Sequence, residues 1–419
     1  MIVREQFDNG LRLLTESMPD VRSVSFGAWL TRGSRHESAP QSGVAHFVEH
    51  MLFKGTARRT AQDIAQEIDS VGGQLDAFTA KECASYYVKV LDEHLSRAVD
   101  VLADLLLHPA FAPDDIEKEQ KVVLEEIKMV EDTPDDLVHE LFTQRFWSGH
   151  PLGRPILGVP STVDALDADV LRDYFCRTYT AGNVVVAVAG NVDHAAVRDL
   201  VTEAFADIPV HGGPTVSGEP TAQPGLLVRD KALEQCHVCL GVSGYPQRHD
   251  DRYACYVLNI VLGGTMSSRL FQNIREKRGL AYAVSSGLVS YHDGGALTIY
   301  AGCDSDAVVE VVDLVMVELQ ELRDRPILSS ELERAKDHLK GSLVLSLEST
   351  SSRMSQLARQ EIYFGHQVTV DDTLRSVERV TLEDVQRVAR DLFQPGRVAA
   401  TVLGRVDGVD LRESQLGLV

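Results

Sequence analysis

Apolar positions along the chain repeat with two different periods, which predicts a mixture of helices and strands. In the segments 95–107 and 116–130 they recur every three or four residues, the spacing of an amphipathic helix. The segments 23–30, 84–90 and 183–189 are shorter and strand-like, with β-branched and aromatic residues. Helices and strands do not alternate in strict β-α-β order. We therefore expect an α+β fold class, with helices packed on one face of a mostly antiparallel sheet.

The whole pattern occurs twice. One apolar run lies between Gly182 and Gly190 and a second between Gly396 and Gly404, so both glycines repeat at an offset of 214 residues. An amphipathic helix precedes each run. This offset is too long for a solenoid repeat and indicates a duplicated domain. We predict a first domain, a linker and a second, homologous domain, at 1–212, 213–224 and 225–419.

The charge balance excludes several classes of protein. Of 419 residues, 62 are acidic and 41 are basic, which gives a formal net charge of −21. Proteins that bind nucleic acid or anionic membranes need a basic surface, so neither partner is expected. No apolar stretch approaches the roughly 20 residues of a membrane helix. The first residues predict neither a secretory signal nor a transit peptide. The acidic excess favours solubility and is also compatible with an acidic cavity for cationic peptides.

The cysteines predict a reducing compartment. Six in a chain of this length are too few for a disulfide framework, so we expect a cytoplasmic protein. Cys236 and Cys239 form a C-x-x-C pair, but no second pair follows at the spacing of a zinc site. The apolar segment 236–242 is predicted to be a buried strand.

Residues 43–55 carry the main candidate for chemistry. Apolar residues recur there at helical spacing, and Gly55 is a plausible helix stop. His46 and His50 are four residues apart and therefore share one face. With Glu49 between them they spell H-x-x-E-H, the inverse of the commoner zinc-protease order. Burying three polar groups in an apolar helix is costly without a partner, which favours a metal ion. Two ordinary hydrogen-bonded histidines remain the alternative.

A catalytic zinc site needs a third protein ligand, and the helix 116–130 offers one. At 100° per residue, Glu119 and Glu126 fall on its apolar face, whereas Glu125 falls on the charged face. We predict Glu126 as the third ligand and Glu119 as a carboxylate that orients a ligand histidine. The alternative for Glu126 is a buried salt bridge. In the second copy Ala335 and Ser342 stand at the positions of these two carboxylates.

These motifs resemble the M16 family of metallopeptidases, the inverzincins that include pitrilysin, insulin-degrading enzyme and the mitochondrial processing peptidase. Glu126 follows His50 by 76 residues, a spacing similar to that of the family. Further segments resemble the family's opening strand, the turn before its metal helix, its active-site strand and its third-ligand helix, at 9–12, 33–37, 72–79 and 123–127. The resemblance covers nearly the whole chain, and the length resembles the half-length, processing-peptidase-like branch.

The resemblance implies a zinc-dependent endopeptidase with one Zn²⁺ per chain and Glu49 as the catalytic base. It also implies substrate contacts from the active-site strand, at Asp76, Ala77 and Phe78. In the second half, Arg275 and Tyr282 have the spacing of the family's substrate-holding pair. An ordinary helix-terminal salt bridge and a core tyrosine are the alternatives for these two residues.

Family architecture further implies that two copies of the chain close around a chamber. We therefore expect a homodimer, or a heterodimer with a related half-length chain, that cleaves unstructured peptides or short protein segments. Leu262-Gly263-Gly264-Thr265 stands where the metal motif would repeat, so the second domain is expected to be metal-free. The main alternative function is a non-catalytic core or assembly subunit of the same fold. A small metal-dependent lyase with H-x-x-E-H is less consistent with the duplication.

Overall fold

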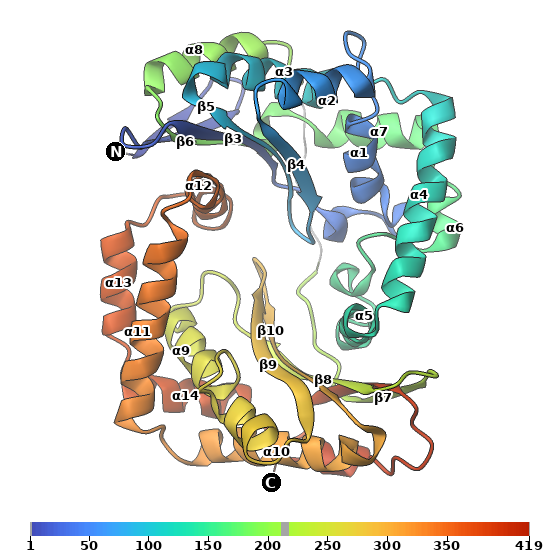
Figure 1. The fold of residues 1–419 in the computed structure, drawn as a ribbon, viewed down its shortest axis with the longest axis vertical. Coiled ribbons are helices and arrows are strands. Elements are labelled where there is room, and N and C mark those ends of the chain that lie inside the picture. Colours follow the sequence, from blue (N-terminus) through green and yellow to red (C-terminus); the bar gives the residue numbers. More distant parts are fainter. Residues whose placement is uncertain (1, 211–217, 419) are drawn as a thin grey trace. The chain divides into compact units, whose positions relative to one another are not determined.

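The structure is a computed structural model that describes residues 2–210 and 218–418. The chain forms two compact units, each assembled from three stretches of sequence (Figure 1). The described residues of the first unit are 2–128, 154–210 and 346–367. Those of the second are 129–153, 218–345 and 368–418.

The first unit is built on a six-stranded sheet in the order β1-β2-β6-β3-β5-β4. The strands, in that order, are Ile2–Gln6, Arg12–Ser17, Val184–Gly190, Ser23–Leu30, Ala84–Leu91 and Gln74–Thr79. Only β2 and β6 run parallel; the other neighbours are antiparallel. The helices are α1 (Val44–Leu52), α2 (Ala61–Asp69), α3 (Leu95–Leu107), α6 (Pro160–Val163), α7 (Ala168–Thr178), α8 (His194–Ala204), α12 (Thr350–Phe364) and most of α4 (Pro113–Asp132).

The second unit is built on a five-stranded sheet in the order β7-β11-β8-β10-β9. The strands, in that order, are Gly225–Asp230, Ala399–Gly404, Cys236–Gly244, Gly295–Cys303 and Ala281–Ser290. The helices are α5 (Pro134–Phe146), α9 (Arg252–Leu262), α10 (Val308–Asp324), α11 (Ser329–Ser346), α13 (Val370–Glu378) and α14 (Leu382–Leu392), with a π-helical segment at Phe271–Glu276. The predicted strand at the C-x-x-C pair is confirmed as β8, with both cysteines buried.

The two sheets repeat one topology, which confirms the expected α+β class and the duplication. Strands β2-β6-β3-β5-β4 of the first sheet match β7-β11-β8-β10-β9 of the second, and the one parallel pair is at the same place in each. Strand β1 is additional. The predicted boundaries at 212 and 225 follow this duplication and stay a prediction. Part of the predicted linker lies outside the described residues.

One detail of the expected fold is wrong: helices cover both faces of each sheet, not one. Strand β6 and all but the first residue of β3 are buried, so both faces of the first sheet are apolar and need cover. Helices α1, α3, α7 and α8 lie over the face that holds the larger core. On the other face, α12 packs against β2, β3 and β6 although it comes from residues 350–364. In the second unit, α5 from residues 134–146 packs against β8 and β11.

Two glycines permit this close packing. A Cβ atom at Gly27 of β3 would lie 2.6 Å from Met354 Sδ of α12, and one at Gly241 of β8 would lie 2.6 Å from the Phe142 ring of α5. The two glycines are 214 residues apart, the offset of the duplication. At the corresponding position of each sheet, a glycine therefore leaves room for a helix that the other half of the sequence supplies.

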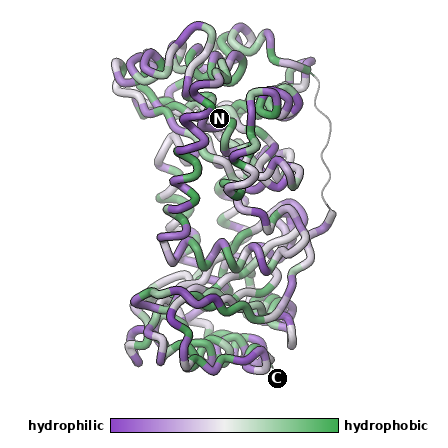
Figure 2. The backbone as a smooth tube through the Cα atoms, turned by 90° about the vertical axis from the view of Figure 1, so that its right-hand side faces the viewer, coloured by the Kyte–Doolittle hydropathy of each residue, from purple (hydrophilic) through white to green (hydrophobic). Residues whose placement is uncertain are grey.

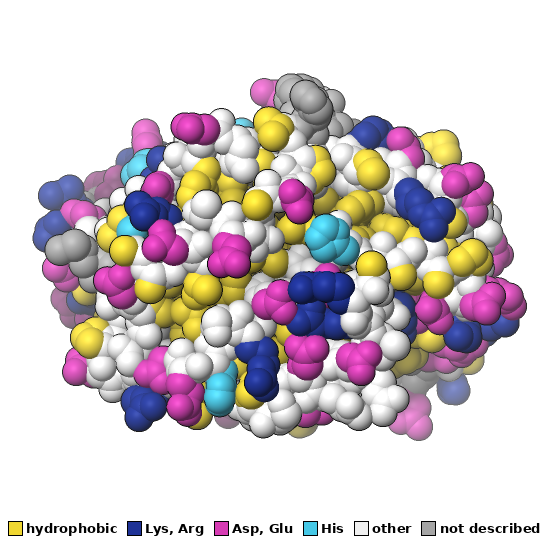
Figure 3. Space-filling model, turned by 90° about the horizontal axis from the view of Figure 1, so that it is seen from above, with side chains coloured by type: hydrophobic (Ala, Val, Ile, Leu, Met, Phe, Trp, Pro, Cys, Tyr) yellow, Lys and Arg dark blue, Asp and Glu magenta, His cyan; other side chains and the backbone are white. Residues whose placement is uncertain are grey.

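The surface is mixed in polarity. Hydrophilic and hydrophobic segments alternate along the helices (Figure 2), as amphipathic helices packed on a core require. On the face shown in Figure 3, acidic, basic and apolar side chains are interspersed. Among the helices of residues 2–210 and 218–418, none has the length and apolar content to cross a membrane.

Candidate metal centre

Helix α1 carries the H-x-x-E-H motif, and a buried carboxylate caps its N-terminus. The cap position is Gly43, whose φ of +97° lies in the region that favours glycine. Glycine has no capping side chain, and the carboxylate of Glu37 replaces it by accepting the N–H groups of Gly43 at 2.9 Å and Ala45 at 2.8 Å. Burial raises the pKa of Glu37 to about 7, although both N–H donors lower it. This anchor fixes the start of the helix.

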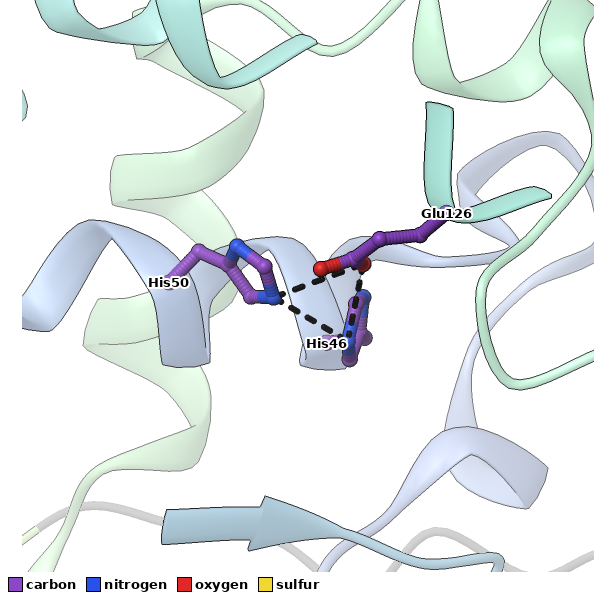
Figure 4. Close-up of side chains that lie close together, drawn as sticks. All are labelled: His46, His50 and Glu126. Carbon is purple, nitrogen blue, oxygen red and sulfur yellow. Dashed lines mark hydrogen bonds and ion pairs between the residues drawn. The ribbon is translucent and has the colours of Figure 1, made fainter. Parts of the chain in front are cut away.

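Core packing then decides which side chains of α1 face away from the sheet. Val44, Phe47, Val48 and Met51 are buried in the core of the first unit. His46 and His50 project to one side of the helix, where they meet Glu126 of α4 (Figure 4).

Three side chains converge on one point between α1 and α4. The Nε2 atoms of His46 and His50 lie 3.2 Å apart, and Glu126 Oε2 lies 3.7 Å from each of them (Figure 4). One ligand atom from each residue lies within 4.8 Å of the others. Among the described residues, this is the only group of three or more His, Cys, Asp or Glu side chains that meets this criterion.

Glu119 orients one of the histidines. Its Oε1 lies 2.8 Å from Nδ1 of His50, so the carboxylate accepts the Nδ1 proton and leaves the Nε2 lone pair of His50 facing the cluster. Its Oε2 accepts an ion pair from Lys54 at 2.6 Å. Glu119 is 4% exposed, so both partners are needed to compensate the burial of its charge. The structure thus places Glu119 where the helical period predicted it.

The donor set fits a divalent metal ion. The Nε2 atoms of the two imidazoles face each other at 3.2 Å, and both lone pairs can point at one ion when the His46 proton is on Nδ1, which has no hydrogen-bond partner among the described residues. Burial, and less strongly the neighbouring His50, lowers the pKa of His46 to about 3, which favours the neutral ring. Glu126 Oε2 is buried and has no hydrogen-bond partner. Two histidines and one carboxylate form the ligand set of catalytic zinc sites that keep one position open.

Glu49 lies next to the cluster and is held by a residue that the sequence analysis did not identify. Thr79, the last residue of β4, donates a hydrogen bond to Glu49 Oε2. Burial raises the pKa of Glu49, and the hydrogen bond from Thr79 acts against this rise. A carboxyl group with a raised pKa is suited to take and return a proton near neutral pH. Thr79 shares a strand face with Ala77, and this alternation is the sequence signal that could have identified it.

Lys54 was missed for a different reason. It follows His50 by four residues, which on a continuous helix would place it on the same face, but α1 ends at Leu52. Its contact with Glu119 depends on the turn after α1 and was not accessible from helical periodicity alone.

The predicted substrate strand is β4, and it is an edge strand. Its only neighbour in the described sheet is β5. Asp76 is exposed, and Ala77 and Phe78 are partly buried. The ring of Phe78 packs edge-to-face on Trp29 with centroids 5.4 Å apart, so this side chain belongs to the packing of the unit.

Arg275 and Tyr282 belong to the second unit and lie beside each other. The Arg275 guanidinium is 4.7 Å from the Phe271 ring centroid and 5.7 Å from that of Tyr282. Arg275 also pairs with Glu276 at 3.1 Å, which agrees with the salt-bridge alternative for this residue. The core-tyrosine alternative is wrong, because Tyr282 is 79% exposed.

Comparison with known families assigns the chain by sequence. The model described as "Insulinase (Peptidase family M16)" matches residues 12–159, and the one described as "Peptidase M16 inactive domain" matches residues 165–339.

Individual relatives agree. The chain is 45% identical to "Uncharacterized zinc protease YmxG" of Bacillus subtilis, over 94% of this chain and 96% of the relative. It is 43% identical to "Uncharacterized zinc protease ML0855" of Mycobacterium leprae, over 96% and 92%. The fold matches the crystal structure of a protease from Helicobacter pylori with a TM-score of 0.89 and 21% identity, over 96% and 99% of the two chains. The chain belongs to peptidase family M16.

Proposed function

We propose that this chain is a zinc-dependent endopeptidase that hydrolyses unstructured peptides. The observation that carries the proposal is the convergence of His46, His50 and Glu126 with a half-buried carboxylate, Glu49, beside them. The names of the relatives support zinc as the metal. One ion per chain is proposed, because the second unit has Ala335 and Ser342 where the first has Glu119 and Glu126.

Each residue of the site has a separate role in this proposal. His46, His50 and Glu126 would hold the metal, and a bound zinc ion supplies Lewis-acid activation of water and of the scissile carbonyl. Glu119 keeps the His50 ring in the orientation that exposes Nε2. Glu49 accepts a proton from the attacking water and passes it to the leaving amine. Thr79 holds the Glu49 carboxylate in place during both transfers.

The substrate is proposed to bind as an added strand along β4. Its outward backbone groups would pair with the peptide backbone, which does not depend on side-chain identity. Cleavage would therefore be broad in sequence and would require an extended, unstructured segment. Ala77 would contribute through its backbone, and Phe78 would support the strand by packing on Trp29.

Removal of metal tests the proposal directly. Purified protein is expected to cleave an unstructured basic peptide, to lose that activity when a zinc chelator is added, and to regain it with stoichiometric zinc. Mass spectrometry of the products identifies internal cleavage. Cleavage that is unaffected by prolonged chelation, with zinc shown to be absent by metal analysis, would contradict the proposal.

Arg275 and Tyr282 are proposed to contact substrate in a dimer, each chain completing the site of its partner. Tyr282 would donate a hydrogen bond to the carbonyl oxygen as charge develops, and Arg275 would hold the substrate backbone. The exposure of Tyr282 and its contact with Arg275 agree with such a role. The partner is proposed to be a second copy or a related half-length chain.

Mixed dimers test this sharing of residues. Chains with Glu49→Gln and chains with Tyr282→Phe are expected to be weakly active alone and to recover activity when mixed, because one of the two sites in each mixed dimer is then intact. The matched control mixes Glu49→Gln chains with Glu49→Gln, Tyr282→Phe double variants, in which no mixed dimer has an intact site. If mixing adds no activity although exchange of subunits is shown by mass spectrometry, the residues do not act across a dimer.

The second candidate function is a non-catalytic core or assembly subunit. The family includes a domain described as inactive, which here matches residues 165–339. The complete ligand cluster of the first unit favours the peptidase. A reducing, cytoplasmic location is proposed from the sparse cysteines, all of which are free thiols in the structure.

A further inference from the structure

The backbone N–H group of Ala77 already has a hydrogen-bond acceptor, although it points to the open edge of β4. The hydrogen-bond pattern of the hairpin shows why it points there. Ala80 N donates to Cys83 O at 2.8 Å, which makes this a hydrogen-bonded pair of the β4–β5 hairpin. Because such pairs alternate along an antiparallel ladder, Asp76 and Phe78 bond to β5, whereas residues 75, 77 and 79 direct their backbone groups to the open edge. The Ala77 N–H therefore points where a bound strand would lie.

The carboxylate of Asp76 covers this donor. Its Oδ1 accepts the Ala77 N–H at 2.8 Å. Its Oδ2 accepts the Tyr87 hydroxyl at 3.0 Å from the neighbouring strand, which holds the carboxylate against the edge. Asp76 is exposed, and the hydrogen bonds found for it among the described residues come from uncharged donors. Its negative charge thus stands at the edge without a cation.

We propose that Asp76 selects peptides that carry a cation opposite it, because such a cation draws the carboxylate away and frees the Ala77 N–H for the incoming strand. This inference rests on the proposed function and adds a substrate class to it, peptides with a lysine, arginine or free amine at one defined position. A peptide without that cation must displace the carboxylate unaided. Because it occupies the Ala77 N–H group, the Asp76 carboxylate also reduces pairing of the open strand edge with other chains.

Two substitutions separate the charge of Asp76 from its hydrogen bond with the Ala77 N–H group. Asp76→Asn keeps an oxygen that can accept the Ala77 N–H but removes the charge. Asp76→Ala removes both. If Asp76 acted only by stabilising the strand, its substitution would change the affinities for neutral and for lysine-containing peptides in the same direction.

Binding is measured with Glu49→Gln protein, so that peptides stay intact. The probes are a short, unstructured, neutral peptide with a fluorescent label and a series in which one lysine replaces a neutral residue at successive positions. With Asp76 present, lysine at one position is expected to tighten binding about fivefold, the size of a partly exposed ion pair. The preference should weaken with added salt.

The two variants are expected to agree on the lysine preference and to differ in their affinity for the neutral peptide. Asp76→Asn is expected to abolish the lysine preference and to leave the affinity for the neutral peptide unchanged. Asp76→Ala is expected to abolish the preference and to tighten binding of the neutral peptide about threefold, because one hydrogen bond no longer competes. Asp207→Asn is the matched control; it removes an exposed carboxylate next to α8, which packs against β2, three strands away from β5.

Four outcomes overturn the inference, and the last of them overturns the proposed function as well. Lysine preference that survives Asp76→Asn shows that the charge does not select. Neutral-peptide binding that weakens in Asp76→Ala shows that the carboxylate does not compete with substrate. If peptides bind and are cleaved in the wild-type chain but show neither effect, the proposed function stands and the inference fails; if no peptide binds to any of the proteins, both fail.

Discussion

Replacing Glu49 with glutamine is expected to lower kcat/KM for peptide cleavage by about 10³-fold, within the range that a positioned acid–base group contributes. Glutamine has nearly the same shape and can still accept the hydrogen bond of Thr79, but it cannot take a proton from water. Zinc content and thermal stability should remain those of the wild-type chain, since Glu49 is not part of the ligand cluster. A fluorogenic peptide measures the rate, and metal analysis measures the zinc.

The matched control is Glu125→Gln, which removes a carboxylate from the exposed face of α4. Glu125 is 68% exposed and pairs with Lys128 at 2.7 Å, so its loss should leave the rate within about twofold. Activity of Glu49→Gln within tenfold of wild type, at equal zinc content, would show that another group moves the proton.

Replacing Glu126 with glutamine is expected to weaken zinc binding by more than about 100-fold, because losing an orienting partner of a ligand already costs about 10–100-fold. The neutral amide is a poorer ligand and no longer balances the charge of the ion. Glu125→Gln, one residue away on the same helix, should leave zinc affinity unchanged. Competition with a chromophoric chelator measures both variants.

This pair of variants also tests the interpretation of helix α4. The alternative considered for Glu126, a buried salt bridge to Arg or Lys, is not what the structure has; among the described residues, the ion-pair partners within 4.0 Å of Glu126 are the two histidines. Equal zinc affinities for the Glu125 and Glu126 variants would mean that Glu126 is not a ligand. Activity of Glu126→Gln that returns at high zinc concentration would separate weakened binding from a misfolded site.

The cluster of His46, His50 and Glu126 was predictable because each of its parts is local. His46 and His50 lie on one face by helical spacing, and Glu126 lies on the apolar face of its own helix by the same rule. Both rules need only the sequence near the residue. Their agreement in two separate helices made the ligand set more specific than either motif.

The supporting contacts were not predictable in the same way. Thr79 reaches Glu49 across 30 residues, Glu37 caps α1 from the turn before it, and Lys54 reaches Glu119 from beyond the helix end. Each contact depends on how two elements meet, and hydrophobic periodicity says which face is buried but not which residue lies opposite it.

The helices that cover the second face of each sheet show the same limit. Gly27 and Gly241, separated by the offset of the duplication, marked the places of close approach. The sequence did not say which helix fills them, because an amphipathic helix fits any apolar face of suitable size. Compact packing assigned α12 to the first sheet and α5 to the second.

The sequence by itself therefore determined the duplication, the α+β class and the two helices that carry His46, His50 and Glu126. These depend on period, composition and spacing, which are properties of short stretches of chain. The family was indicated by the resemblance of the motifs to those of a known family. Only the tertiary structure decided the exchange of helices between the halves, the anchoring of α1, the partners of Glu49 and Glu119, and the cover of the β4 edge by Asp76. These depend on contacts between distant residues, which exist only when burial of apolar surface has brought the elements together.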